Sequence, residues 1–241
     1  MTEHFKRAKT EFYMTPQAPC PYLAGAVERK LFAFLGGPSS AGQNDYLTRR
    51  GFRRSQNIIY MPSCPGCNAC VPVRIAMDGF ALSKSQRRTR NRNADLTRTI
   101  RPAQATSEQF SVLRAYLDAR HYDGGMADMT ALDYIAMVEE TSVDTMVIEY
   151  RDRDGRLIAV GLTDRLSDGL SMVYSFFDPD DAKRSLGDYV ITDHADLARE
   201  LNLPYVYLGY WVAGSRKMDY KKRYKPLEKL TPAGWVPFKD D

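Results

Sequence analysis

The sequence predicts an α+β fold, in which a Cys-rich N-terminal region (residues 1–105) packs on a mixed sheet with helices formed by residues 106–241. Two observations predict it. The second region has three strand-like segments joined by short turns, then a long helical segment and a further strand, an order typical of α+β layers. All four cysteines lie in the first region, where Gly and Pro interrupt short segments, and we expect irregular structure there.

Capping residues and spacing predict the helices of the second region. Thr106 to Gln109 has the pattern of a capping box, and further helices are expected from about Thr130 and over residues 186–201. The apolar residues at helical spacing are Phe110, Leu113 and Leu117 in the first helix and Leu132, Ile135 and Val138 in the second.

Strand formers and turn residues predict the sheet of the second region. Turns are expected at residues 152–155 and 167–169 because both contain Asp and Gly. The expected strands are residues 145–150, 157–163, 170–177 and 205–212. The basic segment from Lys217 to Lys229 is too aromatic for a disordered linker.

Charge is distributed unevenly between the two regions. Residues 1–105 carry 17 Lys and Arg against 6 Asp and Glu, whereas residues 106–241 carry 17 against 24. A strongly basic half is typical of a protein that binds a polyanion, although a solvated basic face is the alternative. No apolar run is long enough to span a bilayer, and residues 1–7 lack the apolar core of a secretory signal. We therefore expect a cytoplasmic protein without a membrane partner.

The cysteines form a pattern suited to metal binding. Cys64, Cys67 and Cys70 are spaced C-x2-C-x2-C, and Cys20 lies upstream as a fourth candidate ligand. Four thiolates suit either tetrahedral zinc or a [4Fe–4S] cluster, and the spacing does not choose between them. A metal-free thiol cluster is the alternative, while disulfides are disfavoured in the cytosol. The sequence indicates no organic cofactor.

Two arginine-rich stretches flank the cysteines, at residues 49–57 and 83–93. A guanidinium group can hold a phosphate or a carboxylate by two hydrogen bonds, so these stretches suit RNA phosphates or an acidic peptide. Ion pairing with the acidic second region is the alternative. A third anion site is expected where Arg184, Ser185 and Gly187 open the last helix, although Ser185 could act there as a simple N-cap. The histidines are scattered, and His194 is expected to be a surface or packing residue and not a catalyst.

Taken together, these motifs closely resemble the aminoacyl-tRNA–protein transferases, in their bacterial leucyl-transferring branch. The resemblance runs through Cys20–Leu23, Gly51–Asn57, Cys64–Arg74, Ser85–Arg88, Arg120–His121, Gly124–Met126, Val173–Asp180, Arg184–Gly187, Tyr207–Trp211 and Lys217–Leu227. It implies transfer of leucine from leucyl-tRNA to the N-terminal amine of proteins that begin with Asp or Glu, which marks them for degradation by the N-end rule.

The resemblance also implies a GNAT-like (acetyltransferase-type) fold for residues 106–241. In that fold a turn of the form R-x-x-G-x-G/A normally holds the pyrophosphate of acetyl-CoA. Arg184 and Gly187 keep the start of this signature, but Tyr189 stands at its last position. The departure favours a site that holds the CCA end of an aminoacyl-tRNA rather than CoA.

Direct aminolysis of an aminoacyl ester needs positioning, a proton acceptor and oxyanion stabilisation. We expect Asp178 to orient or deprotonate the amine, and Tyr174 and Tyr210 to donate to the oxyanion or to the leaving ribose hydroxyl; packing is the alternative role for each tyrosine. The candidate binding residues for the acidic substrate and the tRNA are Arg53, Arg54, Ser55, Gln56, Arg87 and Arg88, with Arg184, Ser185 and Gly187 at the tRNA acceptor end.

Three other functions stay open at this point. The chain could transfer arginine, or it could be a CoA-dependent N-acyltransferase, against which Tyr189 argues. It could also be a non-catalytic, metal-stabilised RNA-binding module, which the basic first region favours. The oligomeric state is not indicated by the sequence.

Overall fold

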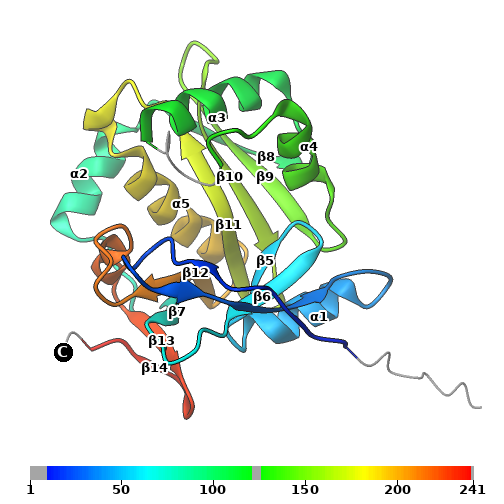
Figure 1. Ribbon diagram of the computed structural model, residues 1–241. Helices are drawn as coiled ribbons and strands as arrows, with labels where there is room; N and C mark the ends of the chain where they lie inside the picture. Colours follow the sequence, from blue (N-terminus) through cyan, green and yellow to red (C-terminus); the bar gives the residue numbers. More distant parts are fainter. Residues whose placement is uncertain (1–9, 121–125, 240–241) are drawn as a thin grey trace, which may run out of the picture.

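A mixed sheet of eight strands organises the computed structural model, which describes residues 10–120 and 126–239 (Figure 1). The strand order is β14-β13-β7-β12-β11-β10-β9-β8, and only β11 and β12 pair in parallel. The strands are β7 (Cys70–Ala76), β8 (Thr97–Pro102), β9 (Thr145–Arg151), β10 (Leu157–Arg165), β11 (Gly169–Phe177), β12 (Tyr205–Val212), β13 (Leu227–Thr231) and β14 (Gly234–Pro237).

Helices cover both faces of this sheet, as Figure 1 shows. On one face, α3 (Ser107–Arg120) and α4 (Ala131–Glu139) pack on apolar residues of β9, β10 and β11. On the other face, α5 (Leu186–Glu200) buries Val190, Ile191 and Ala195 against the sheet. Helix α2 (Lys84–Arg92) lies against α5, and two short 3-10 helices, η1 (Ala182–Arg184) and η2 (Asp219–Arg223), follow β11 and β12. The resulting layers confirm the α+β prediction.

A smaller sheet forms in the first region. It has the order β1-β4-β6-β5, from β1 (Tyr13–Met14), β4 (Lys30–Phe34), β6 (Ile58–Pro62) and β5 (Arg53–Ser55). Helix α1 (Ser40–Thr48) packs on it through a small core that includes Leu47, Phe52 and Ile59. A separate pair joins β2 (Ala18–Pro19) to β3 (Val27–Glu28).

The second region follows the sequence prediction closely. The capping box at Thr106 and Gln109 is present, and Thr130 caps α4 by the same exchange with Asp133. The predicted apolar face of α4 is confirmed at Val138 and wrong at Leu132 and Ile135, which are 76% and 41% exposed. Tyr134 faces the core beside Val138. The four expected strands are β9, β10, β11 and β12.

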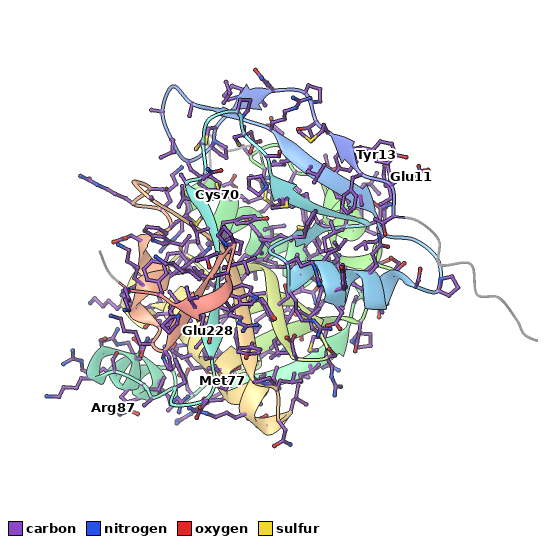
Figure 2. All side chains as sticks on the ribbon, turned by 90° about the horizontal axis from the view of Figure 1, so that it is seen from below. Glu11, Tyr13, Cys70, Met77, Arg87 and Glu228 are labelled. Atoms are coloured by element: carbon purple, nitrogen blue, oxygen red, sulfur yellow. The ribbon has the colours of Figure 1, made fainter. Side chains whose placement is uncertain are left out.

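The expectation of irregular structure in residues 1–105 is wrong. This region forms the small sheet and supplies two strands of the large one, β8 at its edge and β7 between β12 and β13. Figure 2 shows Cys70 and Met77 at opposite ends of β7, with Glu228 of β13 beside the strand. Sheet membership therefore does not follow the division at residue 105.

The small sheet is fixed to the large one by buried polar contacts. Nε and Nη2 of Arg54 on β5 donate to both carboxylate oxygens of Asp164 on β10, at 2.6 and 2.7 Å. Both side chains are only 1% exposed. The Tyr210 hydroxyl donates to Gly51 O at 2.7 Å, and the Trp235 indole donates to Arg49 O at 2.9 Å. These contacts set the position of β5 relative to β11.

We predict that Asp164→Asn destabilises the protein by about 3–5 kcal/mol, because it leaves the Arg54 charge buried without a carboxylate. Urea unfolding followed by circular dichroism measures this loss. Asp118→Asn is the control, since Asp118 pairs with Arg114 on an exposed helix face and its loss should cost below about 0.5 kcal/mol. Equal losses in the two variants would contradict the role given to the buried pair.

Candidate functional site

The candidate site lies where β11 and β12 separate. Only three residue pairs join these strands, Gly169–Tyr205, Leu170–Val206 and Ser171–Tyr207, although the strands continue to Phe177 and Val212. Beyond those pairs the facing backbone groups have no strand partner and must be satisfied in other ways. We call the space between residues 172–177 of β11 and residues 208–212 of β12 the wedge.

Each strand carries a β-bulge where the wedge begins. The register between β10 and β11 shifts at Val173, and the register between β7 and β12 shifts at Leu208. A bulge bends its strand and is often found beside an active site. The two bulges therefore account for the separation of the strands.

Arg53 fills the start of the wedge. Its Nη2 donates to the carbonyl oxygens of Met172 at 2.7 Å and Val173 at 3.2 Å, which β12 no longer reaches. The side chain lies directly over Gly209, where a Cβ atom would come within 1.6 Å of Nη1. Gly209 also has a φ of +73°, which favours glycine. A glycine is thus required here for two independent reasons.

A second cation, Lys221 of η2, binds the backbone of β12. Its ammonium donates to the carbonyl oxygen of Tyr210, and the residue is 5% exposed. Among residues 10–120 and 126–239, no carboxylate lies within salt-bridge distance of Arg53 or Lys221. Burial, and next the charge of Arg53, lower the pKa of Lys221 to about 7. Near neutral pH this lysine is therefore partly an unprotonated amine.

A hollow of about 320 Å³ lies beside the wedge. It is lined by Trp211, Gly214, Ser215, Arg216, Asp219 and Lys222. Its residues come from the end of β12, the following turn and η2, so it shares two chain segments with the wedge. The hollow contains one aromatic side chain, two cations and one carboxylate.

The far end of β11 meets α3 and the start of α5. The rings of Tyr116 and Phe177 are 4.9 Å apart, and the Arg120 guanidinium lies 5.1 Å from the centre of the Phe177 ring. A Cβ atom at Gly187 would stand 3.3 Å from the same ring. Gly187 thus lies near the mouth of the wedge. The stretch containing His121, Gly124 and Gly125, which the family resemblance includes, falls outside the described residues.

Arg184 makes structural contacts with neighbouring residues, and Ser185 has an unusual backbone conformation. Arg184 pairs with Asp95, and its carbonyl accepts a hydrogen bond from the Asn93 amide at 2.9 Å. Ser185 has a φ of +53°, and its side chain makes no capping hydrogen bond to α5, so it is not a simple N-cap. The predicted anion site at this turn stays a prediction.

A basic face surrounds α2. Gln86 of α2 donates to Arg223 O at 3.4 Å, which ties the helix to η2, and Arg92 donates to Lys183 O of η1. Arg87 points outward from this helix in Figure 2. The exposed cations of this basic face are Lys84, Arg87, Arg88, Arg92, Lys183 and Arg223. The structure thus places Arg87 and Arg88 on this surface and not in the wedge.

The four cysteines are free, half-buried and near one another. Burial, and next the neighbouring Cys64, Cys20 and Cys67, raise the pKa of Cys70 to about 11. In the described part of the chain, no three His, Cys, Asp or Glu side chains are arranged to hold a metal ion. The zinc or iron–sulfur site stays a prediction, and no chemical step below depends on it.

The structure does not bring Asp178, Tyr174 and Tyr210 together. The Asp178 carboxylate pairs with Arg156 beyond the end of β11. The Tyr210 hydroxyl has one proton, which it shares between the carbonyl oxygens of Gly51 and Tyr60. This proton is therefore not available to an oxyanion. Tyr174 packs with the α3–α4 cluster, where burial and Tyr116 raise its pKa. Only Tyr174 remains a candidate beside the wedge.

The predicted anion-binding role of Arg54 is wrong, because Asp164 and the carbonyl of Gln56 occupy its guanidinium in the core. Successive residues of a strand point to opposite sides, so only Arg53 reaches the wedge. Ser55 is exposed at the end of β5, and Gln56 in the following turn has a φ of +51°. His194 is a packing residue as expected: its Nδ1 donates to Val190 O at 2.7 Å and its Nε2 accepts from Thr163 at 2.8 Å.

Sequence reasoning missed Lys221, Arg216 and Lys222 as site residues. The available signal was the segment from Lys217 to Lys229, which is basic and aromatic together. Which of its cations turns inward depends on the 3-10 geometry of η2, and local periodicity does not reveal this.

None of the helices in the described ranges is long and apolar enough to cross a bilayer.

Comparison with known proteins identifies the family. The family models described as "Arginine-tRNA-protein transferase, N terminus" and "Arginine-tRNA-protein transferase, C terminus" match residues 18–88 and 108–231. The aspartate/glutamate leucyltransferase of Nitrobacter winogradskyi is 55% identical over 98% of this chain and 95% of its own length. Those of Methylorubrum extorquens and Rhodopseudomonas palustris are 54% and 56% identical, over 98% of this chain and 99% and 94% of their own.

Among solved structures, L-PGS from Bacillus licheniformis aligns with a TM-score of 0.47 at 13% identity, over 59% of this chain and 45% of its own. The sequence comparisons settle the family, since relatives above 50% identity match nearly the whole chain. The chain therefore belongs to the arginine-tRNA-protein transferase family, a family of aminoacyltransferases with the named aspartate/glutamate leucyltransferases among this chain's relatives.

Proposed function

We propose that this chain transfers leucine from leucyl-tRNA to the N-terminal amine of cytoplasmic proteins that begin with Asp or Glu, and so marks them for degradation. The wedge carries the proposal: it holds the half-buried Arg53 and the buried Lys221, neither with a carboxylate partner among the described residues, beside two strands that no longer pair. The names of the full-length relatives support leucine as the donor and Asp or Glu as the acceptor.

The reaction is an aminolysis in which no protein nucleophile is needed. The acceptor ammonium first loses a proton, and the amine lone pair then forms a bond with the ester carbonyl carbon. The tetrahedral intermediate collapses as the carbon–oxygen bond to the ribose breaks. The ribose oxygen takes up a proton, and the nitrogen loses its second one, which leaves a neutral amide.

Arg53 and Lys221 have complementary tasks in this proposal. The Arg53 charge lies where an oxyanion on the ester would develop, and a preorganised cation in a water-poor site stabilises such a charge strongly. Lys221, with a pKa of about 7, accepts a proton from the attacking nitrogen and passes one to the ribose oxygen. Arg53 contacts carbonyl groups of β11 and Lys221 contacts one of β12, so the ester would lie between these two strands.

The basic face provides a surface for the tRNA. Its exposed cations surround α2 and continue onto η1 and η2. These two short helices follow the diverging ends of β11 and β12. Cations on such a surface gain affinity by releasing counterions from phosphates. Gly187 and the start of α5 lie between this face and the wedge, on the path that an acceptor end would follow.

The defining experiment uses purified protein, labelled leucyl-tRNA and arginyl-tRNA, and peptides that begin with Asp, Glu, Arg or Ala. Transfer of leucine to the Asp and Glu peptides alone is the expected result. Transfer of arginine would assign the other donor, and tRNA binding without transfer from either would refute the proposal.

The pH dependence of kcat at saturating peptide tests Lys221. The neutral amine is the base, so kcat should fall about tenfold per pH unit below a midpoint near 7 and level off above it. Arg53→Gln removes a cation that lowers this pKa and should move the midpoint to higher pH, while Arg53→Lys should not. Lys221→Met should lose about 10²–10⁴-fold in kcat. An unmoved midpoint in Arg53→Gln would rule out Lys221 as the base.

Gly209→Ala tests the position of Arg53. The added Cβ atom overlaps Nη1, so the guanidinium must leave the wedge, and we expect a loss of about 10²-fold or more in kcat. Gly155→Ala is the matched control, because Gly155 has a φ of +82° with open space around its Cβ position. It should carry only the backbone strain and keep its activity. Equal activity of the two variants would exclude the displacement mechanism.

The double change Arg87→Ala and Arg88→Ala tests the basic face. We expect weaker tRNA binding at every salt concentration, and a plot of log affinity against log salt that is shallower by about 1.8 for two lost phosphate contacts. Filter binding over a salt series measures the slope. Arg165→Ala, an exposed cation at the end of β10, should leave the slope unchanged. A wild-type slope in the double variant would remove α2 from the tRNA surface.

A further inference from the structure

The hollow beside the wedge has the position needed by a short side chain next to the reacting amine. Lys222 follows Lys221 directly, and Trp211 follows Tyr210, whose carbonyl accepts the Lys221 hydrogen bond. Trp211 belongs to the part of β12 that bounds the wedge and also lines the hollow, so the two spaces adjoin along this strand.

The hollow carries an excess of one positive charge. Lys222 pairs with Asp219 at 3.1 Å, which neutralises that lysine. Within the described ranges, Arg216 has no carboxylate within salt-bridge distance, although it lines the hollow. A single carboxylate bound here would make the hollow neutral, whereas an amide would leave Arg216 unpaired.

Aromatic contacts hold one side of the hollow in place. The Lys222 ammonium lies 5.0 Å from the centre of the Trp211 ring, and Phe238 packs against the same ring at 5.0 Å. The excess positive charge, together with the unpaired Arg216 beside this fixed aromatic side, points to a ligand that carries a negative charge.

We propose that this hollow binds the side-chain carboxylate of the acceptor's first residue, Asp or Glu, with Arg216 as its main partner and Lys222 as the second. The inference rests on the proposed function and assigns its acceptor specificity. The Arg216 guanidinium holds the carboxylate by two parallel hydrogen bonds, while Lys222 adds a fixed point charge. A hollow of about 320 Å³ accommodates either acid, since they differ by one methylene. The bound carboxylate leaves the α-amine facing Lys221 in the wedge.

A mutant cycle between protein and peptide tests the assignment. Transfer kinetics at saturating leucyl-tRNA are measured for wild type and Arg216→Gln, each with peptides that begin with Asp or Asn and are otherwise identical. We expect Arg216→Gln to lower kcat/KM about tenfold or more for the Asp peptide, mainly through KM, and to leave the Asn peptide nearly unchanged. Such coupling isolates the contact between Arg216 and the carboxylate. Lys229→Gln, which removes a nearby cation outside the hollow, should show no coupling.

Calorimetric titration of the full chain with the Asp peptide, without tRNA, separates this inference from the function on which it rests. Binding that weakens in Arg216→Gln supports the hollow even where transfer is absent, and that absence would refute only the function. If wild type transfers leucine and Arg216→Gln loses kcat/KM equally for the Asp and Asn peptides, the hollow is not the acid site, while the proposed function stands. An increase in the KM for leucyl-tRNA with no change for the peptides would assign Arg216 to a phosphate and also overturn the inference.

Discussion

The separation of β11 from β12 is the constraint on which the remainder of this structure depends. Two strands that stop pairing inside a sheet leave carbonyl groups without partners, and burying such groups is costly. Here the cost is met by two cations from other elements: Arg53 of β5 donates to carbonyl groups of β11, and Lys221 of η2 donates to one of β12. Because neither cation has a carboxylate partner among the described residues, the same solution that satisfies the backbone also creates a positively charged space.

The small sheet places the Arg53 side chain against β11. Arg53 and Arg54 are neighbours on β5 and point to opposite sides. Arg54 is locked to Asp164 in the core, and this lock fixes the strand from which Arg53 extends. Tyr210 adds a second lock between β12 and the loop before β5. The position of Arg53 is thereby defined by contacts within the core and between the sheets.

The sequence was a good guide wherever structure depends on local signals. The capping box at Thr106, the Asp-Gly turns and the strands of the meander all form as expected. It was a poor guide to β7, where Pro72 and Cys70 hide a central strand, because the partners of that strand on β12 lie about 130 residues or more away. The same limit affected the site. Asp178 looked well placed just after β11 but pairs with Arg156, and Lys221 points inward because η2 is folded against Tyr210.

The origin of β7 has a consequence for biosynthesis. Its two neighbours in the sheet, β12 and β13, comprise residues 205–231, so both edges of β7 stay unpaired until almost the entire chain has left the ribosome. Sheets closed by such distant segments fold slowly, and unpaired strand edges favour aggregation. A nascent chain of this protein therefore carries an unpaired strand through most of its synthesis. The wedge, which needs both β12 and η2, forms only at the end of this process.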